Sequence, residues 1–362
     1  MARNIVLCFD GPYGMQSNIV RLYRTLARVE GQVTYYTVGT IDPPVHFGNT
    51  LKVVKRVLSL GFGFGLFEEL RDAYDFLVRT YQEGDRVYFF GVGRGAYTAR
   101  TLAGILHLSG LILPGSEALT PYAIRIATKL DDETFEAARE FKAAFSRDCP
   151  VYFVGVWETP AQFGWIFNPF PLRIPFSANN PGIHIGRQAI AMDERRALFQ
   201  PSFWRPLGPP RAGGPQDLKQ VWFRGVHSDI CGGYPELESG ISKISLQWML
   251  TEAMKYGLLL DSKEMSGVLG LNRSTVARPD ANAPIHESLR TVWWLWEFVP
   301  IKHFDNKTEK MRYALHLGRR RVIPEGALIH QSVLERSDGY PHPKDYAVEI
   351  NQPPSAADDF RH

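Results

Sequence analysis

The sequence predicts an α/β fold, with a mostly parallel sheet and helices on both faces. Asn4–Phe9 is a fully apolar strand that ends at Asp10, and open α/β sheets bind ligands at such carboxyl ends. At Val87–Gly104, β-prone residues lead into a glycine-rich corner and then directly into a helix of small residues. Polar residues also follow two later strands. Together these features predict a sheet with its functional residues gathered at one edge.

Local patterns predict the remaining elements. Ser17 or Asn18 caps a helix whose apolar residues recur at spacings of three and four. The glycine- and phenylalanine-rich stretch Leu58–Leu66 follows no clear strand, so it is predicted to be a hydrophobic loop and not a phosphate-binding loop. The other predicted strands are Val33–Val38, Val151–Trp157 and Gln220–Phe223, and the other predicted helices are Glu68–Tyr81, segments within Leu119–Ser146, one around Arg187–Phe199, and Ile244–Tyr256.

The chain is expected to form one domain over residues 1–362. Residues 160–216 are rich in proline, glycine and aromatic side chains, and we interpret them as a lid-like insertion. The run Val292–Trp296 is broken by Glu297 and Pro300, which predicts a buried wall or an aromatic surface patch and not a membrane span. The last dozen residues are expected to be frayed.

Composition excludes several classes of function. The net charge is +3 with 22% charged residues, and only Arg319–Arg321 forms a cluster, so no nucleic-acid or anionic-membrane surface is predicted. That triplet is interpreted as a solvated or paired face, with a phosphate-binding patch as the alternative. Three cysteines without a CxxC pair predict reduced thiols. Without a signal peptide or transmembrane segment, a cytoplasmic location is expected, with export by a dedicated secretion system left open.

The corner at Gly91-Val92-Gly93-Arg94-Gly95 has the pattern of a nucleophile elbow. In α/β-hydrolases this turn reads Gly-x-Ser-x-Gly, and its strained geometry lifts the central serine above the sheet. Gly93 occupies the serine position here, so the elbow is present and its nucleophile is missing. The competing interpretation is a tight turn in a sheet unrelated to hydrolases.

Glu158 and His227 follow the next two strands in the chain order of a hydrolase triad. Such a triad runs nucleophile, acid, histidine; the acid orients the imidazole, and the histidine, placed on a loop, takes the nucleophile's proton. Glu158 is therefore the candidate acid and His227 the candidate base. The alternative without a catalytic role is that Glu158 is a solvated carboxylate at the strand end and that His227 is a structural histidine.

Seven stretches of the chain, including those around Gly93, Glu158 and His227, resemble the DUF2235 family of α/β-hydrolases, which is related to type VI secretion lipase effectors. The resemblance covers nearly the whole chain and implies an enzyme similar to phospholipases and esterases that act through Ser, Asp and His. Four positions depart from the family pattern at strand ends: Gly93 replaces the serine, Glu158 the aspartate, Pro12 a threonine, and Cys231 a glycine. The matching stretches are Asn4–Gly11, Arg21–Tyr23, Gly84–Arg100, Phe153–Thr159, Ala191–Arg196, Gly225–Tyr234 and Ile323–Arg336.

The surroundings of the site yield further candidates. An oxyanion would bind the backbone N–H of Arg94 together with that of Gly11 or Tyr13, because Pro12 has none. Asp229 is equally a candidate for the pocket and for a loop turn. Cys231 is interpreted as a small buried residue. The alternative is that its thiol replaces the missing serine as the nucleophile.

No metal and no cofactor are predicted. Asp10, Glu158, His227 and Asp229 have donor types that suit a hydrolytic cation, but no ligand spacing supports such a site. Water activated by His227 and Glu158 is a further alternative.

Two functions follow from these observations. The first is a lipase- or esterase-like hydrolase that is inactivated at Gly93 or works by an altered mechanism, so enzyme status is left undecided. The second is a pseudo-hydrolase that uses its pocket to bind a ligand or a protein. In either case the expected ligand is a small or lipid-like ester.

Overall fold

The structure is a computed structural model that describes residues 2–11, 14–39, 65–128, 132–159, 180–204, 216–272, 275–291, 293–305, 310–336, 338 and 343–351. Its centre is an eight-stranded sheet in the order β12-β11-β8-β7-β6-β3-β1-β2, in which every neighbouring pair is parallel. The strands are β1 (Asn4–Phe9), β2 (Gln32–Thr37), β3 (Arg86–Val92), β6 (Val151–Trp157), β7 (Ile183–Ala191), β8 (Asp217–Phe223), β11 (Ala327–His330) and β12 (Tyr346–Glu349). The predicted α/β class is confirmed.

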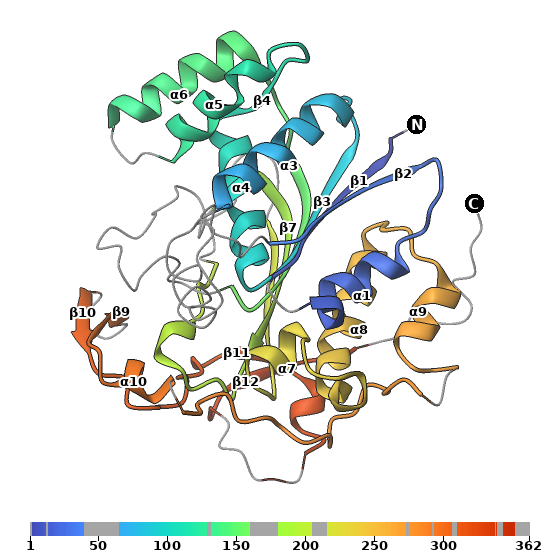
Figure 1. The fold of residues 1–362 in the computed structure, drawn as a ribbon, viewed down its shortest axis with the longest axis vertical. Coiled ribbons are helices and arrows are strands. Elements are labelled where there is room, and N and C mark those ends of the chain that lie inside the picture. Colours follow the sequence, from blue (N-terminus) through green and yellow to red (C-terminus); the bar gives the residue numbers. More distant parts are fainter. Residues whose placement is uncertain are drawn as a thin grey trace, which may run out of the picture.

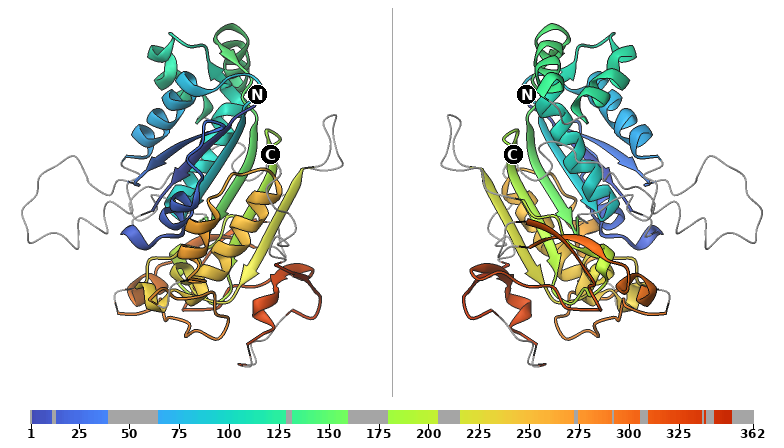
Figure 2. Two further views of the ribbon diagram at one scale, coloured as in Figure 1. Left: turned by 90° about the vertical axis from the view of Figure 1, so that its right-hand side faces the viewer. Right: turned by 90° about the vertical axis from the view of Figure 1, so that its left-hand side faces the viewer.

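Two short antiparallel pairs lie outside this sheet. They are β4 (Leu111–Ile112) with β5 (Ser146–Arg147), and β9 (Ile301–Asp305) with β10 (Lys310–Ala314). The side views in Figure 2 show how the strands of the main sheet twist relative to one another.

Helices cover both faces of the sheet, as Figure 1 shows. Alternate side chains of β1 divide between the two layers: Ile5 and Leu7 pack into one hydrophobic core, and Val6 and Cys8 into the other. The first layer holds α3 (Leu66–Thr80), α4 (Arg94–Ser109), α5 (Thr120–Ala127) and α6 (Asp132–Phe145), and the second holds α1 (Asn18–Thr25), α7 (His227–Cys231), α8 (Gly240–Lys255) and α9 (Ser262–Val268). None of the helices in the described residues is long and apolar enough to cross a bilayer.

The predicted start of the first helix is confirmed. The Ser17 hydroxyl accepts a hydrogen bond from the Val20 N–H at 3.1 Å, so it satisfies one of the free donors at the start of α1. All three cysteines are buried free thiols.

The helix predicted around Arg187–Phe199 is wrong. Residues Ile183–Ala191 form β7, and only Ala197–Phe199 form a short 3₁₀ helix, η4. β7 lies at the centre of the sheet, and the side chain of Arg187 is buried there. Its charge is balanced by Glu252 and Asp217, each of which forms an ion pair with it at 2.6 Å. A buried charge of this kind removes the apolar pattern by which a central strand is recognised.

This strand runs through the interval 160–216 that we interpreted as an insertion. Residues 160–179 and 205–215 lie outside the described residues, as do residues 58–64 of the predicted glycine-rich loop and residues 352–362. The lid therefore stays a prediction.

The glycines that flank the elbow are required by close approach of the backbone. A Cβ at Gly95 would lie 2.0 Å from the Phe9 carbonyl oxygen, and one at Gly91 would lie 2.4 Å from the Gly95 carbonyl oxygen. Real Cβ atoms do not tolerate such distances. The two glycines therefore let α4 begin directly against the ends of β1 and β3.

We predict that Gly95→Ala lowers the free energy of unfolding by about 2–3 kcal/mol, because the new methyl group can only be accommodated by moving backbone. Urea unfolding measures the change. Gly31→Ala is the matched control, since its nearest neighbour would be a Leu259 methyl carbon at 4.0 Å. Equal stabilities for the two variants would contradict this packing.

Candidate active site

Gly93 forms the corner between β3 and α4. Its backbone has φ 52° and ψ −111°, a conformation that side chains of L-amino acids rarely adopt. Its N–H donates to the Trp157 carbonyl at 2.9 Å, which fixes the corner beside the end of β6. A strained strand-to-helix turn of this kind is what the nucleophile-elbow prediction requires, and its corner residue has no side chain.

Glu158 and His227 form a buried pair next to this corner. Glu158 Oε2 lies 3.0 Å from His227 Nδ1, and neither side chain is exposed. An ionised carboxylate can only accept hydrogen bonds, so Nδ1 carries the proton and donates it. In the neutral ring this leaves Nε2 as the basic atom, which is the orientation that a triad acid imposes on its histidine.

Arg321 holds the Glu158 carboxylate from the other side. Its two terminal nitrogens donate to Oε1 at 2.8 Å and to Oε2 at 2.9 Å, and the Ala191 N–H donates to Oε1 at 2.6 Å. Burial would raise the pKa of Glu158, but the Arg321 charge and the hydrogen bonds from His227 and Arg321 outweigh it and lower this pKa to about 2. The carboxylate is therefore held ionised, and its backbone is fixed at a positive φ of 50°.

His227 is the first residue of α7, where the sequence suggested a loop. The carboxylate of Glu194 accepts its backbone N–H at 3.1 Å, and the Phe199 ring meets the imidazole edge to face at 4.8 Å. Hydrogen bonds and the Arg196 charge hold the pKa of Glu194 well below its usual range despite its burial. Glu194, in the segment Ala191–Arg196, therefore helps to position His227 by accepting its backbone N–H.

Cys231 lies one helical turn after His227, and its thiol lies close to the imidazole ring. Its Sγ is 3.8 Å from His227 Nε2. Complete burial raises the pKa of this thiol well above its ordinary value, although the nearby Gly93 N–H favours the ionised form. The thiol therefore lies beside the nitrogen of His227 that is basic in the neutral ring, while its burial disfavours the thiolate form that a cysteine nucleophile requires.

Asp10 occupies the end of β1 as predicted, but its carboxylate is committed to its surroundings. Oδ1 accepts the Gly11 N–H at 2.7 Å, and Oδ2 accepts the hydroxyls of Ser17 at 2.9 Å and Tyr36 at 2.6 Å. The Gly11 N–H is therefore turned to Asp10 here, and the role of Gly11 as an oxyanion donor stays a prediction. Pro12 and Tyr13 lie outside the described residues.

Arg94 begins α4, so its backbone N–H stays the expected oxyanion donor. Its side chain is buried, and burial lowers its pKa while the charge of Glu69 acts in the opposite direction. Glu69 lies beneath the elbow helix, where burial raises its pKa to about 7. No local pattern around Glu69 indicates that this carboxyl group lies so near the start of α4.

Asp229 belongs to a different cluster. Its Oδ2 accepts the Val226 N–H at 3.0 Å at the start of α7, and its Oδ1 lies 2.6 Å from His286 Nδ1. The Val226 contact is the capping-box bond of a helix start and not an Asx-turn, so the turn and pocket interpretations of Asp229 both stay predictions. Within the described part of the chain, no three His, Cys, Asp or Glu residues are placed to hold a metal ion, so the four residues considered for a cation do not form such a site.

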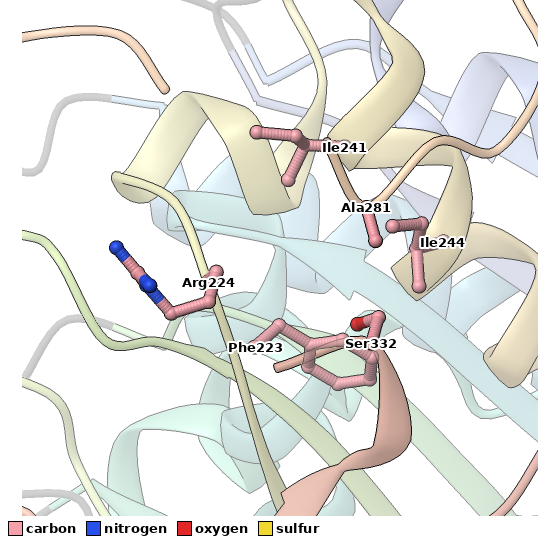
Figure 3. Close-up of a pocket in the computed structure, with 6 residues that line it drawn as sticks. All are labelled: Phe223, Arg224, Ile241, Ile244, Ala281 and Ser332. Carbon is pink, nitrogen blue, oxygen red and sulfur yellow. The ribbon is translucent and has the colours of Figure 1, made fainter. Parts of the chain in front are cut away.

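A small hollow lies near the end of β8, lined by Phe223, Arg224, Ile241, Ile244, Ala281 and Ser332 (Figure 3). Neither Glu158 nor His227 contributes to it. Sequence reasoning missed the residues that do complete the pair, namely Arg321, Glu194 and Phe199. Arg321 was visible only as one member of an arginine triplet, and the structure pairs this one member with Glu158 at 2.8 Å.

Comparison with known proteins assigns the relationship. The family model described as "T6SS, Phospholipase effector Tle1-like, catalytic domain" matches residues 3–252. The uncharacterized protein YEL023C of Saccharomyces cerevisiae is 31% identical over 228 residues, which cover 57% of this chain and 33% of that protein. The chain thus matches about a third of the length of this curated relative.

Two solved structures are similar at low identity. An uncharacterized protein from Pseudomonas aeruginosa has a TM-score of 0.39 and 19% identity, covering 73% of this chain and 47% of that chain. The Tle1 effector bound to the VgrG spike of the type 6 secretion system has a TM-score of 0.37 and 16% identity, covering 67% and 53%.

We predict that Arg321→Met lowers the free energy of unfolding at pH 7 by about 3–5 kcal/mol, because it leaves the buried Glu158 carboxylate without its main counter-charge. Denaturant unfolding tests this. Arg139→Met is the control, since Arg139 pairs with Glu136 on the surface and its loss costs at most about 0.5 kcal/mol. A loss at Arg321 no larger than at Arg139 would refute the role assigned to this ion pair.

Proposed function

The chain belongs to the family of Tle1-like type VI secretion phospholipase effector catalytic domains, and we propose that it is a lipase-like domain that binds a lipid ester without cleaving it. Membership supports a lipase-like function in general. The loss of cleavage is argued from the residues around the elbow.

The absence of a nucleophile at Gly93 carries this proposal. Acyl transfer through a triad requires an oxygen or sulfur atom that attacks the ester carbonyl carbon, and glycine supplies neither. The base and acid remain in hydrolase geometry, with His227 Nδ1 3.0 Å from Glu158. In a serine protease, loss of the serine alone costs on the order of 10⁶ in rate even though the other members remain.

Cys231 does not supply the missing atom. A cysteine nucleophile reacts as the thiolate, and the complete burial of Cys231 raises the pKa of its thiol and so disfavours that form. Its Sγ instead occupies space opposite His227 Nε2, at 3.8 Å.

The expected ligand is a lipid-like ester, as the family description of a phospholipase suggests. A pocket that binds such a molecule without turning it over would act as a ligand sensor or as an interaction module. This proposal concerns the domain described here. The chain matches only part of the length of its relatives.

We predict that restoring the serine and making room for it restores reactivity. Gly93→Ser/Cys231→Gly should be labelled by a fluorophosphonate probe at position 93 and should hydrolyse phospholipid, whereas the unmodified chain does neither. Gly93→Ser alone should react more slowly, because Cys231 Sγ lies 3.8 Å from His227 Nε2 and competes with the new hydroxyl for that nitrogen. Intact-mass spectrometry and release of free fatty acid measure the two effects.

Gly93→Ala/Cys231→Gly is the matched control, since it carries the same cavity change without a hydroxyl. Turnover by the unmodified chain that Cys231→Ala abolishes would identify the thiol as the nucleophile. That result would overturn the proposal.

A further inference from the structure

Glu297 carries a buried carboxylate at the end of α10 (Trp293–Glu297). Its Oε1 accepts the Ala197 N–H and its Oε2 accepts the Gly318 N–H, each at 2.7 Å. Oε2 also lies 3.0 Å from His316 Nδ1. A carboxylate without exposed surface is costly to bury unless such donors surround it. This side chain therefore joins α10 to two segments that are distant from each other in the chain.

The first segment contacts His227. Ala197 begins the 3₁₀ helix η4, and Phe199 ends it. The Phe199 ring meets the His227 imidazole edge to face at 4.8 Å, and the Phe199 carbonyl accepts a hydrogen bond from Arg321. Because η4 is a single short turn, a displacement of Ala197 also displaces the ring that packs on the base.

The second segment leads to Glu158. Gly318 lies three residues before Arg321, whose guanidinium donates to the two oxygens of Glu158 at 2.8 Å and 2.9 Å. Leu317 and Gly318 have positive φ angles of 54° and 65°, and this left-handed backbone is strained at a leucine. Strain of this kind persists only where neighbouring groups hold it, and Glu297 holds this turn through the Gly318 N–H.

Two further contacts join these segments to each other. The Gly318 carbonyl accepts a hydrogen bond from Arg195 Nε at 2.8 Å. His316 Nε2 lies 3.0 Å from the side-chain nitrogen of Gln200, the residue directly after η4. The two segments therefore form one unit around the carboxylate of Glu297.

We propose that Glu297 is a positioning residue for the pair of Glu158 and His227. Its carboxylate holds η4 and the turn at Gly318 together, and through them it places the ring that packs on the base and the guanidinium that pairs with the acid. The proposal rests on the proposed function for the view that this pair belongs to the lipid site, and it adds the group that orders the pair.

The ¹⁵N NMR spectrum of the histidine side chains in the full chain tests this without any turnover. Glu297→Gln keeps the size of the side chain, but its amide has one acceptor oxygen, so either η4 or the turn at Gly318 loses its acceptor. The downfield proton signal of His227 Nδ1 should therefore move upfield or broaden. Glu325→Gln is the matched control, since it removes an exposed carboxylate four residues after Arg321 and should leave this signal unchanged.

Reactivity gives a second measurement. In the background of Gly93→Ser/Cys231→Gly, Glu297→Gln should lower the rate of fluorophosphonate labelling by about tenfold or more, because a displaced base meets the serine in poor geometry. Glu325→Gln should leave this rate unchanged. A background that is not labelled at all would count against the proposed function alone, since the histidine spectrum requires no serine.

A merely structural role for Glu297 is distinguished by the fold of the variant. A folded Glu297→Gln variant that is less stable in urea but has the His227 signal of the unmodified chain would overturn the proposal. If Glu297→Gln does not fold, His316→Ala takes its place, because it removes one donor and leaves both backbone N–H groups on the carboxylate. This variant should move the same signal by a smaller amount, and an unchanged signal would again contradict the role assigned to Glu297.

Discussion

The buried carboxylate of Glu158 is the group on which the site depends. It lies at the end of β6 and receives hydrogen bonds from β7 through Ala191, from α7 through His227, and from Arg321 in the C-terminal third of the chain. An ionised carboxylate is costly to bury without partners, so all three contacts are needed together. One side chain thus fixes the orientation of the base and ties the C-terminal segment to the sheet.

The backbone geometry of the turn at Gly93 does not depend on the side chain at that position. The elbow glycines, Gly91 and Gly95, are required by backbone contacts whatever the residue between them does, so the turn persists without a nucleophile. Gly93 accommodates the positive φ, and Cys231 fills the space before His227 with a neutral thiol. Packing and ion pairing therefore hold the pair of Glu158 and His227 in place whatever residue occupies the corner at position 93.

Much of this could be predicted from local sequence patterns. The first strand, the cap at Ser17, the elbow and the order of Glu158 and His227 all depend on neighbouring residues. β7 was missed because the buried Arg187 disguises a central strand. Arg321 was missed as a site residue because its partner lies 163 positions away, and such pairing exists only in the folded chain.

The orientation of His227 by Glu158 is tested most directly by ¹⁵N NMR of the histidine side chains. At a pH where the ring is neutral, His227 should carry its proton on Nδ1, with a strongly downfield-shifted proton signal that Glu158→Gln removes. Protonation on Nε2, or a spectrum unchanged by Glu158→Gln, would mean that the two residues do not form the acid–base pair of a hydrolase.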